Sequence, residues 1–309
     1  MSVVFTPAVV SSLFEACLSD RDGRPITDPL RIGARGGGFA MSAGIKTRVR
    51  LIEGPGIRVT INGELNEAKT TVNAIKIAIK RLNLHVDGIE VSHVVDVPIG
   101  SGFGTSASGA LGAVLALSLA LRRPISLVDA VRIAHEADVV SGTGLGTAEG
   151  LLAGGVGMVT EPGAPWFGSI DKIPLSDDLV VVAVHFSGIE KSTILSSREA
   201  LARANEAGRK AMERVRASPT IKSLLAEARR FAEESGIGDP DLLRLADELV
   251  AAGAIGASQN MIGRAIHAAV KRARLSDVLK QARGFGGSLI VSDIYDGGPR
   301  VIEAPQASD

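Results

Sequence analysis

The sequence predicts an α+β fold with two domains, because strand-like segments open and close the chain and helix-like segments fill the stretches between them. Apolar and polar residues alternate over residues 39–49, which is the period of a half-buried strand. Apolar residues three and four positions apart over residues 66–82 give the period of an amphipathic helix. Strands, then helices, then strands along a chain are typical of α+β folds with antiparallel sheets.

The first half is expected to form one domain of residues 1–165. Ser126 is a suitable N-cap for a helix over residues 127–139, and the Pro/Gly cluster at 162–165 ends the last strand of this half. The predicted strands and helices, in order, are strands at 3–5, 39–49 and 57–61, a helix at 66–82, a strand at 89–97, a helix from about 105 to 121, a helix at 127–139, and a strand at 154–161.

The second half is expected to form a domain of residues 166–309. It opens with a β-branched apolar run at 179–186, which suits a buried strand. The elements predicted after it are helices at 198–216, 221–235, 242–252, 258–273 and 275–281, then strands at 289–294 and 301–303 around a turn at 296–299.

Composition excludes several classes of protein. Lys plus Arg equal Asp plus Glu among the 309 residues, so nothing in the net charge attracts nucleic acid or an anionic membrane. Aromatic residues make up only 3%, which leaves few platforms for stacking bases. Cys17 is the single cysteine, which excludes an internal disulfide and fits a reducing cytoplasm. Residues 1–14 have no basic side chain, so they do not read as a signal peptide.

The most informative segment is residues 97–121, which read as a strand end, a glycine-rich turn and an apolar helix. Gly100, Gly102 and Gly104 let the backbone turn tightly and approach a ligand closely. Thr105 and Ser106 follow where free amides at a helix start favour an anion. The segment therefore predicts a phosphate-binding loop.

Other interpretations of this loop fit less well. A dinucleotide fingerprint needs its third glycine one position later and an acidic residue about 20 positions on. The chain has Gly104 and then Arg122 and Arg123 there, and it has no Gly-Lys pair for a Walker loop. The strongly apolar part covers only residues 110–121, too short to cross a bilayer and suited to a buried helix.

Three motifs give the chain a resemblance to the GHMP kinases. Residues 98–108, PIGSGFGTSAS, resemble that family's Pro-x-x-x-Gly-Leu-Gly-Ser-Ser-Ala phosphate loop. Ala-His-Glu at 134–136 with the glycine turn at 142–146 resembles its metal-binding glutamate and the following turn, and residues 284–288 resemble its C-terminal glycine loop. Residues 7–8, 142–146 and 256–263 look most like the archaeal pantoate kinases within the family.

The resemblance implies a fold, an activity and a set of ligands. The first domain would be like domain 2 of ribosomal protein S5 and the second ferredoxin-like. The activity would be ATP- and Mg²⁺-dependent phosphorylation of a small alcohol, with Ser106 and Glu136 as the metal ligands. The residues expected to contact ATP are Pro98, Gly100, Ser101, Gly102, Phe103, Gly104, Thr105, Ser106 and, from the second domain, Gly286.

The chain departs from the family at Thr147. Many members have an aspartate just after the glycine turn, which accepts the proton of the attacking hydroxyl; here the position is a threonine, which is not a base. Asp138 and Glu149 are the nearest carboxylates in the sequence. Positioning and charge neutralisation supply most of the catalysis of phosphoryl transfer, so this departure does not by itself exclude activity.

The acceptor is expected to be a small hydroxy acid such as pantoate, held by Arg35, His135, Ser192 and Thr193. A carboxylate needs a cation or a nest of amides, and the two methyl groups of pantoate need an apolar wall. Mevalonate or homoserine is an alternative acceptor, and a catalytically silent ligand-binding homologue is a further alternative motivated by Thr147. The partners expected are a small-molecule substrate and a second copy in a homodimer, with no nucleic acid and no membrane.

Overall fold

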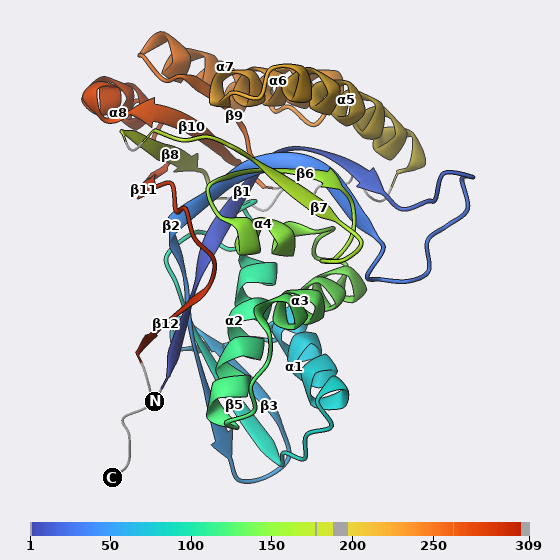
Figure 1. The fold of residues 1–309 in the computed structure, drawn as a ribbon. Coiled ribbons are helices and arrows are strands. Elements are labelled where there is room, and N and C mark those ends of the chain that lie inside the picture. Colours follow the sequence, from blue (N-terminus) through green and yellow to red (C-terminus); the bar gives the residue numbers. More distant parts are fainter. Residues whose placement is uncertain (1, 177, 188–196, 262, 304–309) are drawn as a thin grey trace.

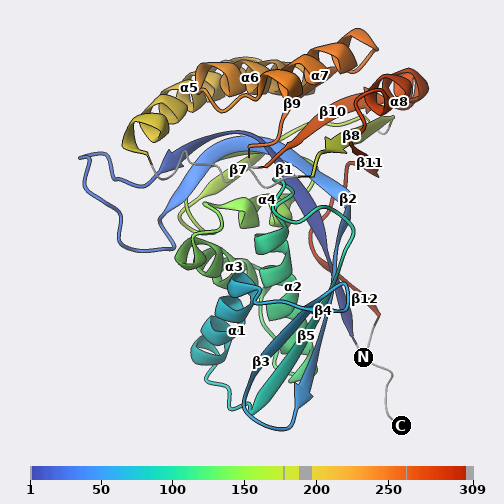
Figure 2. The same ribbon diagram turned by 180° about the vertical axis from the view of Figure 1, so that it is seen from behind.

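The computed structural model describes residues 2–176, 178–187, 197–261 and 263–303. A long curved sheet with helices α1 to α4 on one side forms one part of the molecule, and a smaller sheet with helices α5 to α8 forms the other (Figure 1). Figure 2 shows from behind that β1 and β2 pass beneath the smaller part, so the two parts share a long seam. In the described residues no helix is both long and apolar enough to cross a membrane.

The larger sheet has eight strands in the order β12-β1-β2-β5-β3-β4, with β6 and β7 extending from β2. All its neighbours pair antiparallel except β3 and β5, which pair parallel. Its strands are β1 (Val3–Cys17), β2 (Gly33–Ile52), β3 (Gly56–Ile61), β4 (Glu64–Leu65), β5 (Gly88–Val95), β6 (Val156–Glu161), β7 (Ser169–Ile173) and β12 (Arg300–Glu303).

Helix α2 (Thr105–Ala120) is the buried centre of this part. It has no charged residue and packs among α1 (Lys69–Arg81), α3 (Leu127–Ser141) and the sheet, as predicted for a core helix. Gly112 allows the close approach, because a Cβ there would lie 2.5 Å from the Thr47 hydroxyl of β2. The Ser126 hydroxyl accepts from the Asp129 amide, which confirms the predicted N-cap of α3. The short α4 (Thr147–Ala153) follows the glycine turn.

The smaller sheet has four antiparallel strands in the order β11-β8-β10-β9. Counted along the chain this is the order fourth, first, third, second, as expected for a ferredoxin-like domain. Its strands are β8 (Leu179–His185), β9 (Gly256–Gln259), β10 (Ala265–Lys271) and β11 (Ser288–Asp293), and its helices are α5 (Arg198–Ala217), α6 (Ile221–Glu234), α7 (Pro240–Ala251) and α8 (Leu275–Arg283), with a 3₁₀ turn at Arg272–Arg274.

The helix predicted over residues 258–273 is wrong: this segment contains the end of β9, the turn after it and the whole of β10. Its alanines favour a helix when taken alone. In the fold, however, β10 lies between β8 and β9 and is buried from Ala265 to Val270, so pairing and burial on both faces override that propensity.

The two parts are continuous in their packing. One hydrophobic core contains Val10 and Phe39 from the larger sheet together with Ala183 and Phe231 from the smaller part. The predicted division between residues 165 and 166 falls in the turn between β6 and β7, and β12 returns to pair with β1. The seam matters for function, because the cavity described below lies beside it.

Candidate active site

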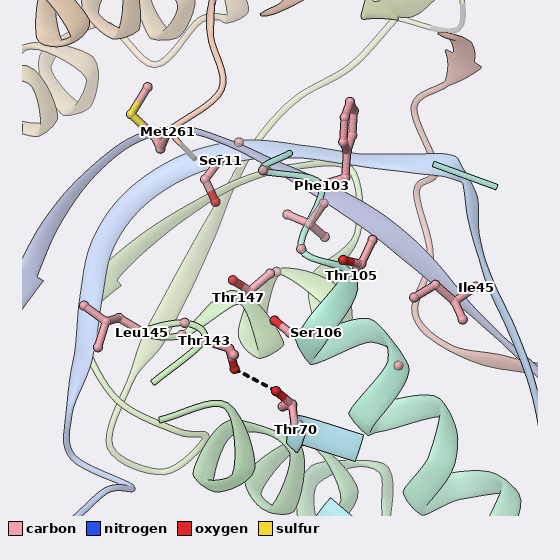
Figure 3. A pocket seen from close by; sticks show the side chains of 18 of the residues that line it. Ser11, Ile45, Thr70, Phe103, Thr105, Ser106, Thr143, Leu145, Thr147 and Met261 are labelled. Atoms are coloured by element: carbon pink, nitrogen blue, oxygen red, sulfur yellow. Dashed lines mark hydrogen bonds between the residues drawn. The ribbon is translucent and has the colours of Figure 1, made fainter. Parts of the chain in front are cut away.

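A cavity of about 840 Å³ opens between the phosphate loop, β1, β2 and the glycine turn before α4. The side chains of Thr105, Ser106, Thr143 and Thr147 gather in one region of it, with Ser11 and Met261 nearby (Figure 3). Five of these six side chains come from the larger part, and Met261 comes from the β9–β10 turn. The cavity therefore brings together the segments whose sequences predicted a phosphate site.

The phosphate loop has the predicted conformation. Gly100, Gly102 and Gly104 have φ of 74°, 78° and 62°, values that favour glycine, and Gly104 is the N-cap of α2. The Val9 amide donates to the Phe103 carbonyl at 3.1 Å, so β1 fixes the loop. The predicted loop residues that line the cavity are Gly100, Gly102, Phe103, Gly104, Thr105 and Ser106, whereas Pro98 and Ser101 are outside the lining.

A buried carboxylate lies next to the start of α2. Asp138 of α3 accepts hydrogen bonds at its Oδ1 from the hydroxyls of Ser106, at 2.9 Å, and Thr143, at 2.7 Å. Thr70 in turn contacts the Thr143 hydroxyl at 2.8 Å (Figure 3). Burial raises the pKa of Asp138, although these two hydrogen bonds act in the opposite direction.

The second carboxylate oxygen of Asp138 has no hydrogen-bond partner among the described residues. Gly144 leaves the space for it, because a Cβ at that position would lie 2.0 Å from Oδ2. The Ser106 hydroxyl lines the cavity, and the Asp138 carboxylate lies directly behind it, outside the lining, with Oδ1 accepting from that hydroxyl. Hydroxyl and carboxylate oxygens are the hard donors that Mg²⁺ prefers. The residues present therefore fit a magnesium ion held by Ser106 and Asp138. No group of three or more His, Cys, Asp or Glu side chains suited to a metal occurs in the part of the chain described here, so phosphate and water would complete the coordination.

Glu136, the predicted carboxylate ligand, lies elsewhere. It forms an ion pair with Arg81 of α1 and does not line the cavity. Two residues along an α-helix are about 200° apart around its axis, so Glu136 and Asp138 cannot both point toward Ser106. The structure thus brings Ser106 together with Asp138 and not with Glu136. The sequence contains the acidic residue Asp138 two positions after Glu136, but it does not show which of the two side chains faces Ser106.

His135 and Glu149 form a buried pair behind the cavity wall. The His135 Nδ1 lies 3.0 Å from a Glu149 carboxylate oxygen, and Nε2 donates to the Ile32 carbonyl at 2.9 Å. Burial lowers the pKa of His135, but the hydrogen bond and charge of Glu149 outweigh it and the pKa is raised. Neither side chain lines the cavity, so the predicted contact of His135 with a substrate is not made. The pair instead ties the segment before β2 to α3 and α4.

Thr147 lies where predicted, at the start of α4 and in the cavity wall. Its methyl group packs on the phosphate loop, because a Cβ on Gly104 would lie 2.8 Å from the Thr147 Cγ2. Among the described residues of the wall the carboxylate is Glu67, an exposed residue in the loop before α1. A buried carboxylate base of the kind expected after the glycine turn is therefore absent from the described wall.

The part of the cavity along β1, β2 and β6 is largely apolar, with a row of glycines at 36–38. Arg35 lines it, and its guanidinium lies 3.3 Å from Glu15 and 3.5 Å from Glu161. The Glu161 side chain is 55% exposed, so this second partner is held weakly. Ser192 and Thr193 lie outside the described residues.

The turn of the smaller part that meets the phosphate loop is not the one that was predicted. Gly286 is outside the cavity lining and has no atom within 4 Å of where its Cβ would be. Met261 does line the cavity, and a Cβ on Gly263 would lie 2.7 Å from the Gly100 carbonyl. The β9–β10 turn therefore occupies the place expected for residues 284–288. The predicted helix over this turn hid its role, although residues 256–263 stood out as a motif.

The fold and the site define a GHMP kinase. The family model for the GHMP kinases N terminal domain matches residues 66–149, so this part of the chain is similar to that domain. The family match and the similarity to curated kinases indicate an ATP-dependent phosphotransferase that acts on an alcohol group. The predicted family and fold class are confirmed.

Its similarity to individual proteins extends over the whole chain. A pantoate kinase of Thermococcus kodakarensis is 29% identical over 301 residues, which is 96% of this chain and 97% of that protein. A pantoate kinase of Methanocaldococcus jannaschii is 26% identical, covering 94% and 100% of the two chains. A solved structure described as a phosphotransferase related to the CoA biosynthesis pathway is 28% identical and superposes with a TM-score of 0.84, covering 97% and 98%.

Proposed function

We propose that this protein is a pantoate kinase that transfers the γ-phosphoryl group of ATP to the 4-hydroxyl of pantoate, giving 4-phosphopantoate and ADP for archaeal coenzyme A synthesis. The observation that carries the proposal is the full-length similarity to two archaeal pantoate kinases together with a cavity that joins a phosphate loop to an apolar wall. We also propose that it works in the cytoplasm, where Cys17 stays reduced. A homodimer remains a prediction.

The phosphate loop binds the donor. Amides of the glycine turn and of the first turn of α2 point toward an anion, and the helix dipole adds to their attraction. A bound Mg²⁺ supplies charge neutralisation on the phosphate oxygens. The Ser106 hydroxyl and Asp138 Oδ2 would hold it, while Thr143 fixes the Asp138 carboxylate by its hydrogen bond to Oδ1.

The apolar wall binds the acceptor. The apolar surface that the two methyl groups of pantoate need comes from Leu13, Val159 and Met261. The Arg35 guanidinium binds the pantoate carboxylate in place of its present partner, the exposed Glu161. The row of glycines in β2 lets the acceptor lie close to backbone. Replacing Arg35 by alanine is then expected to raise the KM for pantoate at least tenfold and to leave the KM for ATP within about twofold.

Transfer proceeds without a carboxylate base. Phosphoryl transfer has a loose transition state with little bond formation to the nucleophile, so the hydroxyl proton need not be removed beforehand. It leaves late, to an oxygen of the transferred phosphoryl group and from there to water. Holding the acceptor oxygen in line with the γ-phosphorus then provides most of the rate. This accounts for a threonine at position 147 in an active kinase.

The proposal is tested by ADP release at saturating ATP and Mg²⁺ with pantoate, mevalonate and homoserine as acceptors, and by ³¹P NMR of the product. We expect kcat/KM for pantoate to exceed the other two at least a hundredfold, with a phosphoester at the 4-oxygen. Preference for mevalonate or homoserine would assign another acceptor. Bound ATP without turnover on any of the three would identify a silent homologue.

A further inference from the structure

A chain of buried polar side chains connects the smaller part of the molecule to the phosphate loop. The Asn260 amide nitrogen donates to the Ser101 carbonyl at 2.8 Å, and Asn260 Oδ1 lies 2.9 Å from His267 Nδ1. His267 Nε2 lies 2.7 Å from the Ser12 hydroxyl. The side chains of Ser12, Asn260 and His267 are all fully buried, so no solvent replaces any of these bonds.

The Ser101 carbonyl at one end of this series fixes the direction of each hydrogen bond in it. The Ser101 carbonyl can only accept, so the Asn260 Nδ2 faces it and Oδ1 faces His267. Because Oδ1 only accepts, the His267 proton lies on Nδ1, and Nε2 accepts from the Ser12 hydroxyl. Burial lowers the pKa of His267 to about 3, so the ring stays neutral and keeps this arrangement at physiological pH. These three hydrogen bonds therefore all run in one direction, from Ser12 to His267, from His267 to Asn260, and from Asn260 to the Ser101 carbonyl.

The two ends of this hydrogen-bonded series lie on the two sides of the cavity. Ser101 belongs to the phosphate loop, whereas Ser12 lies in β1 between Ser11 and Leu13, which both line the cavity. The pairing of β1 with β2 shifts register between Ser11 and Leu13, which leaves Ser12 as the extra residue of a bulge. The Met261 amide, next to Asn260, lies 3.4 Å from the Ser11 carbonyl.

We propose that Ser12, His267 and Asn260 are positioning residues, a relay through which the smaller part of the molecule holds the phosphate loop at a fixed place relative to the β1 wall of the cavity. None of the three is in the cavity lining, so they act through the Ser101 carbonyl and the bulge of β1. The reacting atoms of an in-line transfer must be held within a fraction of an ångström, and the donor loop and the acceptor wall come from separate elements. The inference rests on the proposed use of this cavity for nucleotide and acceptor.

The test compares two amide-to-carboxylate substitutions in neighbouring buried residues. Asn260→Asp removes the donor to Ser101 and sets a carboxylate against that carbonyl. Gln259→Glu is the matched control. The Gln259 Oε1 accepts from the Asp239 backbone amide at 2.8 Å and its Nε2 donates to the Ile237 carbonyl at 3.5 Å, and neither bond involves the phosphate loop. Both variants lose a side-chain donor to a backbone carbonyl, so both should lower the melting temperature, Asn260→Asp by more because its bond is the shorter.

The readout is the dissociation constant of ATP·Mg²⁺, measured by calorimetry on the full chain without an acceptor. We expect Asn260→Asp to weaken binding at least tenfold, or about 1.4 kcal/mol, and Gln259→Glu to leave it within about twofold. Ser12→Ala, a milder change at the far end, is expected to weaken binding about threefold. Equal weakening in Asn260→Asp and Gln259→Glu, or an unchanged constant in Asn260→Asp or Ser12→Ala, would overturn the relay. Because no acceptor is present, a wrong acceptor assignment would leave these results unchanged.

Discussion

Replacing Asp138 by asparagine should abolish most of the activity while leaving the fold intact. The side chain keeps its shape, and its Oδ1 can still accept from Ser106 and Thr143 at 2.9 and 2.7 Å. What is lost is the negative charge and the free electron pairs of Oδ2, the atom that has no partner in the described structure. The substitution therefore removes a proposed metal ligand and little else.

The size of the effect follows from these contacts. Loss of one electrostatic contact aimed at the reacting charge lowers kcat by about 10²–10³, or about 3–4 kcal/mol. The free energy of unfolding should change by no more than about 1 kcal/mol, because the variant no longer buries a charge but leaves an amide nitrogen without a partner. Since burial raises the pKa of Asp138 above its ordinary value of 3.8, the wild type loses stability relative to the variant as pH rises from that value through the folded pKa.

Glu136→Gln is the matched control for this prediction. It removes a carboxylate from the same helix, but one that pairs with Arg81 near the surface and is worth about 0–1 kcal/mol of stability. Steady-state ADP release and urea unfolding, measured on both variants from pH 5 to 9, separate the two residues. A loss of kcat in Glu136→Gln as large as that in Asp138→Asn, or near wild-type kcat in Asp138→Asn, would refute the assignment of the metal ligand.

Three further substitutions probe the neighbourhood of this carboxylate. Thr147→Ala should lower kcat less than about tenfold at saturating substrates, because a threonine hydroxyl accepts no proton at neutral pH; a loss of a thousandfold would show that it takes part in the chemistry. Gly144→Ala places a Cβ 2.0 Å from Asp138 Oδ2 and should raise the Mg²⁺ concentration needed for half-maximal rate at least tenfold, whereas unchanged magnesium dependence would contradict the site. Glu149→Gln removes the partner that raises the pKa of His135. The free energy of unfolding in urea should therefore be higher for the wild type than for the variant by a full amount below pH 6.5, and this difference should shrink as pH rises through the pKa of His135 in the folded protein. A difference that does not change with pH would disprove a charged pair.

Local features of the site could be predicted from the sequence. Three glycines, a threonine and a serine between a strand and an apolar helix predict an anion-binding turn, since the backbone angles and the free amides depend on neighbouring residues alone. The structure has those angles at Gly100, Gly102 and Gly104. The N-cap at Ser126 is local in the same way and is confirmed.

Contacts between distant segments could not be predicted in the same way. Whether Glu136 or Asp138 meets Ser106 depends on how α3 is rotated against α1 and α2. The residue that pairs with Glu136 is Arg81, which is 55 residues away in the chain. The turn after β9 was missed because the alanines of the following segment, β10, favour a helix, and only pairing with β8 and β9 makes β10 a strand. Arg35 was expected to hold the acceptor, and the structure places it in β2 with its guanidinium between two carboxylates of this chain.

The most direct measurement of the central claim is the position of the metal. A crystal of the protein with Mn²⁺ and a non-hydrolysable ATP analogue would show the ion by its anomalous scattering. We expect one peak beside the phosphate loop, bonded to the Ser106 hydroxyl and to Asp138 Oδ2 at about 2.2 Å, with phosphate oxygens on its other side. A peak at Glu136, or triphosphate bound away from the start of α2, would contradict it.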